Sequence, residues 1–157
     1  LLREDAVNAL RWHILPKADL LTPNRPEAEL LADMKIDSEK DIDVAARKLI
    51  DMGPKAVLIR GGHFGSASAA EFTDWLALPD EPLIALKQPG VKTSNNHGTG
   101  CTLSAAIATY LGLGLGIRDA IVHAQKFLNH CLRHGYAPGL GAGPPNHASW
   151  IAKRVGE

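Results

Sequence analysis

A short apolar run at residues 56–59 (Ala-Val-Leu-Ile) constrains the fold more than any other stretch of the chain. It lies between Lys55 and the sequence Arg60-Gly61-Gly62, and it lacks the polar–apolar alternation of a half-buried strand. Unbroken apolar runs of this length are typical of strands buried on both faces, as in parallel sheets covered by helices. The run therefore predicts an α/β fold with a mostly parallel sheet.

The residues before this strand can supply the connection that a parallel sheet requires. Residues 18–21 are predicted to form a short strand, and a helix follows with Pro26 near its first turn. Ser38, followed three residues later by Asp41, resembles a capping box at the start of a second helix. Strand, helices and strand over residues 18–60 predict a right-handed crossover.

The rest of the chain of 157 residues suits one compact domain, and no internal repeat is present. The expected elements are a helix over 3–14, strands over 72–77 and 83–87, a helix starting near 99 and a helix from 117 to about 134. The Gly/Pro-rich residues after Gly135 are expected to hold little regular structure.

Charge and cysteine content exclude several classes of partner. Lysines and arginines number 17, as do aspartates and glutamates, so the formal net charge is zero. There is no basic surplus for nucleic acid and no basic amphipathic or long apolar run for a membrane. The two cysteines, Cys101 and Cys131, lie far apart, which suits reduced thiols and a cytoplasmic location.

Residues 92–108 begin as a polar loop and end as a helix. Gly98 and Gly100 allow unusual backbone dihedrals and a close approach to a ligand. The first N–H groups of a helix have no partner within it, so this segment is a candidate anion site, with phosphate as the obvious anion. It is not a Walker A loop. The alternative is a tight loop that only enters a packed helix, with Cys101 as a small buried residue.

The segment 97–107 (HGTGCTLSAAI) resembles the signature of hydroxymethylpyrimidine/phosphomethylpyrimidine kinases, members of the ribokinase superfamily that act in thiamine biosynthesis. Three further segments agree with that family in order and type: 21–29, 60–63 and 139–147. Most ribokinase relatives have Asp where this chain has Cys101, so the cysteine narrows the resemblance to the pyrimidine kinases.

The resemblance implies a three-layer ribokinase-like fold and ATP-dependent phosphorylation of 4-amino-5-hydroxymethyl-2-methylpyrimidine and of its monophosphate. It implies a catalytic set made of Gly98, Thr99, Gly100 and Cys101, in which Cys101 accepts the hydroxyl proton. It assigns nucleotide binding to Asn24, Arg60, Gly62 and Thr93. ATP and Mg²⁺ are the expected cofactors, and a small pyrimidine is the expected substrate.

Mg²⁺ would be held by Glu27 with Asn24, since this ion prefers oxygen ligands and needs few carboxylates beside phosphate. Alternatively, Asn24 only caps a helix, and Glu27 only complements its N-terminus. His130 and His134 are spaced like two zinc ligands, but no third ligand has motif spacing, so a solvated face is expected.

The chain begins at Leu1 within a helix-like stretch, whereas the family's kinases carry a substantial region before it. We therefore expect residues 1–157 to be the C-terminal, nucleotide-binding portion of a kinase whose N-terminal part is missing. Such a portion would expose apolar surface, so it is expected to pair with that part or to form a homo-oligomer. Two alternatives remain: a pyridoxal/pyridoxine kinase of the same superfamily, and a truncated, non-catalytic remnant that binds nucleotide.

Overall fold

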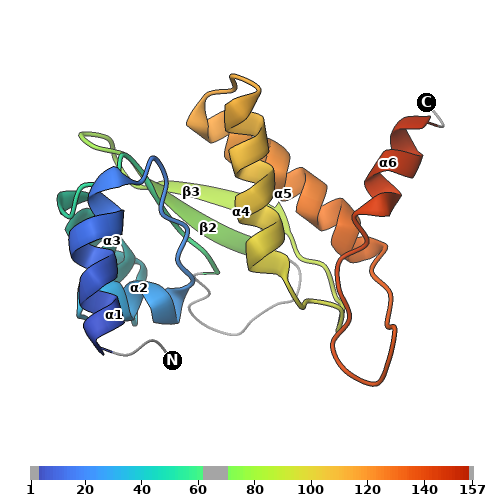
Figure 1. Ribbon diagram of the computed structural model, residues 1–157, viewed down its shortest axis with the longest axis horizontal. Helices are drawn as coiled ribbons and strands as arrows, with labels where there is room; N and C mark the ends of the chain where they lie inside the picture. Colours follow the sequence, from blue (N-terminus) through green and yellow to red (C-terminus); the bar gives the residue numbers. More distant parts are fainter. Residues whose placement is uncertain (1–3, 62–70, 156–157) are drawn as a thin grey trace. The chain divides into compact units, whose positions relative to one another are not determined.

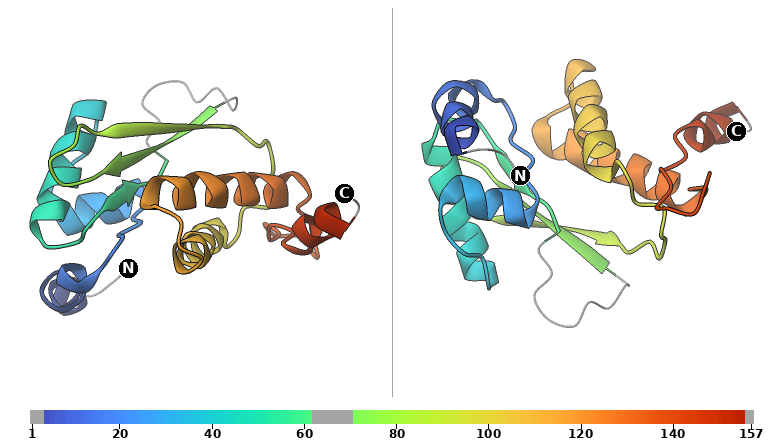
Figure 2. Two further views of the ribbon diagram at one scale, coloured as in Figure 1. Left: turned by 90° about the horizontal axis from the view of Figure 1, so that it is seen from above. Right: turned by 60° about the horizontal axis from the view of Figure 1, so that its bottom comes forward.

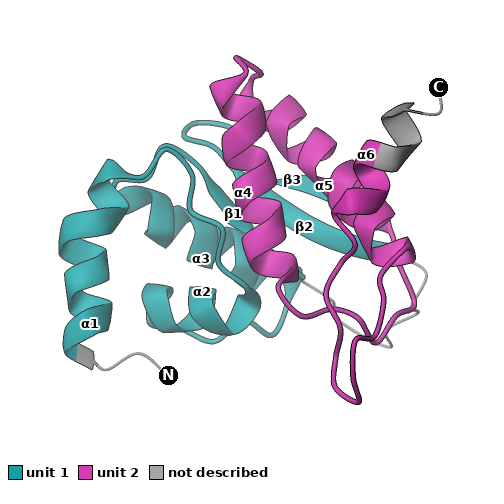
Figure 3. Cartoon of the chain, turned by 45° about the vertical axis from the view of Figure 1, so that its right-hand side comes forward, with its two compact units in different colours: residues 1–88 teal, residues 89–157 magenta. Residues whose placement is uncertain are grey.

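The computed structural model describes residues 4–61 and 71–155, and the chain divides into two compact units (Figure 3). Unit 1 comprises residues 1–88 and contains most of the sheet, together with the helices that pack on it. Unit 2 comprises residues 89–157, and its described regular structure is almost entirely helical.

The first helical stretch of unit 1 is less regular than the sequence predicts. The α-helix α1 spans Glu4–Ala9, the π-helical turn η1 spans Leu10–Ile14, and the 3-10 turn η2 spans Leu15–Lys17. Pro16 lies in the last of these turns. A proline has no N–H and clashes with the preceding turn of an α-helix, so the regular helix has to end nearby.

Helices α2 (Arg25–Ala32) and α3 (Glu39–Asp51) confirm the predicted pair. The Ser38 side chain accepts a hydrogen bond from the Asp41 N–H and caps α3. Gly53 follows α3 with a φ of 113°, and a Cβ there would lie 2.7 Å from the Pro16 Cα. The chain therefore needs glycine where it leaves α3.

The sheet has the order β1-β2-β3, with β1 at Val57–Ile59, β2 at Glu71–Ala77 and β3 at Ile84–Pro89. All of β1 is buried, as its apolar run predicts. Helix α3 packs against β1 and β2 (Figure 2). Unit 1 buries a cluster that includes Leu15, Ile36, Ile42 and Leu49.

The direction of the strands differs in part from the prediction. β1 runs antiparallel to β2, with Leu58 opposite Leu76. Parallel pairing occurs as isolated bridges, Leu21 with Val57 and Asn24 with Arg60, so the predicted strand at 18–21 is reduced to a bridge. A mostly parallel sheet is therefore not seen among the described strands, whereas the α/β class is.

Unit 2 consists of α4 (Thr99–Gly112), α5 (Ile117–Arg133) and α6 (Ala148–Val155). Helices α4 and α5 lie side by side (Figure 1). The prediction of little regular structure after Gly135 is wrong for α6. The Asn146 side chain accepts the N–H of Ser149 and starts this helix where glycine and proline give way to apolar residues. Within residues 4–61 and 71–155, no helix combines the length and apolar character that crossing a membrane requires.

Candidate functional site

The loop before α4 enters the helix through a glycine in the left-handed region. Gly98 is the residue that precedes α4, with a φ of 80° and a ψ of 9°. A side chain at this position would be strained by its backbone conformation, although a Cβ would have nothing within 4 Å. The glycine that the sequence marks as permissive is thus required here for its dihedral angles.

The first turn of α4 presents backbone N–H groups that the helix does not use. Within the helix, the first hydrogen bond runs from the Thr102 N–H to the Gly98 carbonyl at 2.9 Å, and the Thr99 N–H only approaches the Asn96 carbonyl at 3.5 Å. Among the described residues, no acceptor lies on the N–H of Gly100 or Cys101. No acidic side chain stands in this turn. Such a helix start favours an anion.

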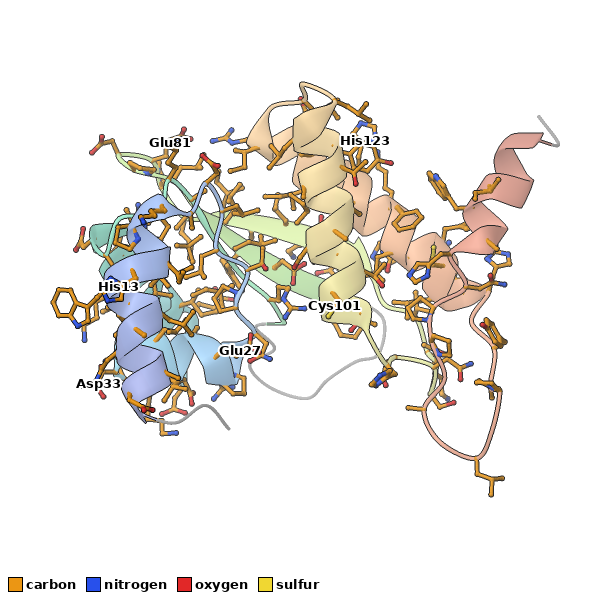
Figure 4. The ribbon with its side chains drawn as sticks, viewed as in Figure 1. His13, Glu27, Asp33, Glu81, Cys101 and His123 are labelled. Atoms are coloured by element: carbon orange, nitrogen blue, oxygen red, sulfur yellow. The ribbon has the colours of Figure 1, made fainter. Side chains whose placement is uncertain are left out.

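Cys101 lies in this first turn and is exposed, which removes the alternative of a small buried residue (Figure 4). Cys131 is the opposite case, because it is fully buried and burial raises the pKa of its thiol to about 11. The structure thus leaves Cys101 accessible to a ligand and keeps Cys131 as a neutral packing residue.

A hollow of about 650 Å³ extends from the first turn of α4 along the helix. Most of its wall is apolar, so the hollow suits an apolar surface better than an anion. Cys101 and Thr102 stand at the end where the hollow adjoins the free N–H groups. Its lining residues are Cys101, Thr102, Ala105, Ala106, Thr109, Tyr110, Leu113, Phe127, His147 and Trp150.

The residues between α5 and α6 contact both the loop before α4 (residues 92–98, called the anion loop below) and the first turn of that helix. Before the helix, the Gly143 N–H donates to Asn95 Oδ1 at 3.2 Å, and the Gly143 carbonyl accepts the His97 N–H at 3.1 Å. Within the first turn, Thr102 Oγ1 lies 2.9 Å from His147 Nε2. The sequence analysis missed these pairs. The segment 139–147 did take part in the family resemblance, but nothing in its spacing indicated which residues it touches.

In unit 1, Asn24 and Glu27 form a reciprocal cap at the start of α2. Asn24 Oδ1 accepts the Glu27 N–H at 2.9 Å, and Glu27 Oε2 accepts the Asn24 N–H at 2.8 Å. Arg60 Nη2 lies 3.9 Å from the same Glu27 oxygen, while Arg60 Nε donates to the Thr22 carbonyl at 3.0 Å. The structure therefore brings together three of the residues that the sequence selected, and it realises the capping role.

These unit 1 residues can also hold Mg²⁺ through water. The Glu27 side chain is 55% exposed, so its carboxylate can face a hydrated ion. The Asn24 side-chain oxygen is already used by the cap, so its part would be indirect. Mg²⁺ keeps several waters and needs only one or two carboxylates, which fits this arrangement. Among residues 4–61 and 71–155, no group of three His, Cys, Asp or Glu side chains is placed to enclose a metal.

The remaining candidate residues stand as follows. Thr93 Oγ1 accepts the Asn95 N–H at 3.0 Å, so Thr93 shapes the anion loop. Gly62 lies outside the described residues. His130 and His134 stack with their ring centroids 4.3 Å apart, and His134 Nδ1 lies 2.9 Å from the His130 carbonyl oxygen. The predicted solvated face holds for His134, which is exposed, but not for His130, whose Nε2 is buried with no hydrogen-bond partner among the described residues.

An α/β chain whose glycine-rich loop opens a helix with free N–H groups is typical of proteins that bind phosphate groups. The comparison with known families makes this class specific: the phosphomethylpyrimidine kinase family matches residues 1–146. The chain belongs to the phosphomethylpyrimidine kinase family.

Individual relatives agree with this assignment. The chain is 44% identical over 149 residues to a hydroxymethylpyrimidine/phosphomethylpyrimidine kinase of Synechococcus elongatus, covering 94% of this chain and 55% of the relative. It is 38% identical over 155 residues to the kinase of that name from Haemophilus influenzae, covering 99% and 57%. The chain thus spans about half the length of the curated relatives that it matches.

Among solved structures, the pyridoxal kinase of Staphylococcus aureus in complex with ADP superposes with a TM-score of 0.87 at 29% identity. The match covers 96% of this chain and 55% of that kinase.

Proposed function

We propose that this protein phosphorylates 4-amino-5-hydroxymethyl-2-methylpyrimidine and its monophosphate with ATP, a step of thiamine biosynthesis. The observation that carries the proposal is the first turn of α4, where the N–H groups of Gly100 and Cys101 have no acceptor among the described residues and the Cys101 thiol is exposed. Phosphoryl transfer depends mainly on positioning and on neutralising charge, which such a turn supplies. Family membership supports the choice of substrate.

The candidate residues fall into three proposed roles. Backbone N–H groups from Gly98 to Cys101 stabilise the transferring phosphoryl group, and the Cys101 thiolate accepts the proton of the substrate hydroxyl. Arg60, at the end of β1, neutralises nucleotide charge, with Gly62 and Thr93 near the phosphates. Asn24 and Glu27 would hold a hydrated Mg²⁺, which would supply positive charge beside the phosphates.

We further propose that residues 1–157 are the nucleotide-binding portion of a three-layer, ribokinase-like fold with a mostly parallel sheet. The parallel bridges of Leu21 with Val57 and of Asn24 with Arg60 support this arrangement. Because the chain spans about half of its curated relatives, the activity is proposed for the whole protein.

A pyridoxal kinase is the second candidate, favoured by the TM-score of 0.87 to the Staphylococcus aureus enzyme. The sequence identity favours the pyrimidine, since it is 44% to the Synechococcus elongatus kinase and 29% to the pyridoxal kinase. Comparing ADP release with hydroxymethylpyrimidine and with pyridoxal decides between them. Turnover of pyridoxal alone would replace the proposal, and binding of an ATP analogue without turnover of either would indicate a non-catalytic remnant.

The anion site itself is tested by Gly100→Val. Its branched side chain should crowd the N–H groups of the first turn and weaken binding of an ATP analogue, measured by calorimetry, without unfolding the protein. Gly112→Val is the matched control, because Gly112 ends the same helix and a Cβ there meets nothing within 4 Å. Equal affinities of the two variants would remove the anion site from this turn.

A further inference from the structure

We propose that residues 143–147, between α5 and α6, are a positioning element that holds the anion loop and the first turn of α4 in a fixed orientation relative to each other. This inference rests on the proposed function, because it concerns how that site is built. Gly143 forms hydrogen bonds with the loop before α4, and His147 contacts Thr102 in the helix, just after Cys101. The free N–H groups of Gly100 and Cys101 lie between these two attachments.

The attachment at Gly143 depends on close backbone contact. Its N–H and its carbonyl are both used, by Asn95 Oδ1 at 3.2 Å and the His97 N–H at 3.1 Å. A Cβ built on Gly143 would clash with the carbonyl oxygen of Tyr136 and would come within 2.5 Å of Asn95 Oδ1. Since backbone atoms cannot move aside as side-chain ends can, only glycine lets the segment approach the loop this closely.

The attachment at His147 acts on the helix itself. Thr102 is the first residue whose N–H bonds within α4, and the residue is only 9% exposed. Its hydroxyl lies 2.9 Å from His147 Nε2, and the His147 ring lies nearly parallel to that of Phe127 on α5, with centroids 6.1 Å apart. His147 therefore ties the start of α4 to α5 by one polar contact and one ring contact.

The two attachments have a kinetic consequence. A misplacement of about 1 Å in an oriented site can cost ~10²-fold in rate. N–H groups that stabilise a transferring phosphoryl group act mainly in the transition state, so loosening them lowers kcat more than it raises the KM of the acceptor substrate. Residues 143–147 contribute no group to the reaction and act only through the loop and the turn.

The test uses the full-length natural protein with matched pairs of variants. Gly143→Ala is compared with Gly141→Ala, where a Cβ would meet nothing within 4 Å. His147→Phe keeps a ring against Phe127 but loses the hydrogen bond, whereas His147→Gln can keep a hydrogen-bonding group near the position of Nε2 and should restore most of the rate. Thr102→Val is compared with Thr109→Val, because the Thr109 hydroxyl donates to the Ala105 carbonyl within α4.

We expect Gly143→Ala to lower kcat ~10- to 100-fold, and His147→Phe to lower it about tenfold or less, with acceptor KM nearly unchanged. Amide hydrogen exchange over residues 95–102 should become faster in both variants and stay at the wild-type rate in Gly141→Ala. If Gly143→Ala does not fold, the His147 pair decides the outcome.

Three results would overturn the inference: unchanged exchange and kcat, faster exchange at unchanged kcat, or a lower kcat at unchanged exchange. The first shows no attachment, the second a purely structural one, and the third an effect that does not pass through the loop. If the wild-type protein phosphorylates neither pyrimidine nor pyridoxal, the proposed function fails. The exchange rates and the affinity for an ATP analogue then still decide whether residues 143–147 position the loop.

Discussion

Replacing Gly98 by alanine isolates the conformational requirement of the anion loop. The residue has a φ of 80° and a ψ of 9°, and a Cβ on it would meet nothing within 4 Å. Steric exclusion therefore adds nothing, and the cost is that of holding an L-residue in the left-handed region, about 1–2 kcal/mol. Gly98→Ala should reduce the free energy of unfolding by that amount.

Thermal unfolding followed by circular dichroism measures the effect. For a protein of 150 to 250 residues, about 1–2 kcal/mol lowers Tm by ~2–8 °C. Gly98→Asn should lose less, because asparagine visits the left-handed region more readily. Gly112→Ala should lose nothing, since it adds a good helix former at an open position of the same helix.

Gly98→Ala also tests the anion site, because a loop that relieves the backbone strain at position 98 must change the orientation of the N–H groups that follow. Gly98→Ala should therefore weaken binding of an ATP analogue, whereas Gly112→Ala should leave it unchanged. Wild-type stability and wild-type affinity in Gly98→Ala would refute the left-handed entry to α4. The orientation of the Gly100 and Cys101 N–H groups would then have to be reconsidered as well.

Four further predictions concern the site and its surroundings. In the full-length protein, Cys101→Ala should lower kcat ~10²- to 10⁴-fold while nucleotide affinity stays nearly intact. Cys101→Asp should keep some activity, and Cys101→Ser should have a low kcat. Equal turnover by Cys101→Ala and the wild type would make Cys101 a packing residue. Glu27→Gln should raise the Mg²⁺ concentration needed for half-maximal rate without lowering Tm, because glutamine can replace glutamate in a capping box. Iodoacetamide should label the exposed Cys101 under native conditions and Cys131 only after unfolding, as peptide mass mapping would show. Burial raises the pKa of Cys131 from 9.0 to about 11. The contribution of this thiol to the free energy of unfolding should therefore be complete below pH 9 and decrease as the pH rises through 11. Cys131→Ala should abolish this pH dependence in urea unfolding curves.

Features encoded by neighbouring residues could be predicted from the sequence. The cap of α3 by Ser38, the buried strand β1 and the helix start at Thr99 each depend on side chains within a few positions of one another. Hydrophobic spacing and capping chemistry fix such elements locally, so a single sequence is sufficient to find them. The place of Cys101 in the first turn of α4 followed from the same source, because the glycines before it set that place. Its exposure did not, since the sequence was also compatible with a small buried cysteine.

Features that depend on distant pairs could not be predicted in this way. Thr102 and His147 are 45 positions apart and Asn95 and Gly143 are 48 apart, so no periodicity relates them. The sequence did not predict the antiparallel pairing of β1 with β2 for a related reason. An apolar run such as residues 56–59 shows that a strand is buried, but either direction of its neighbour would bury it equally.

Glu27 shows why the structural and functional interpretations of one residue need not compete. The Asn24 N–H holds Glu27 Oε2 at 2.8 Å, and this cap limits the positions that the carboxylate can take. The side chain nevertheless remains 55% exposed, and Arg60 lies 3.9 Å from the same oxygen. A carboxylate fixed by its own helix loses little conformational freedom when it meets a hydrated cation, so the cap prepares the ligand instead of replacing it. Removal of the charge and removal of the cap are therefore separable. Glu27→Gln tests removal of the charge alone, whereas Glu27→Ala would remove the charge and the cap together and could not distinguish their effects.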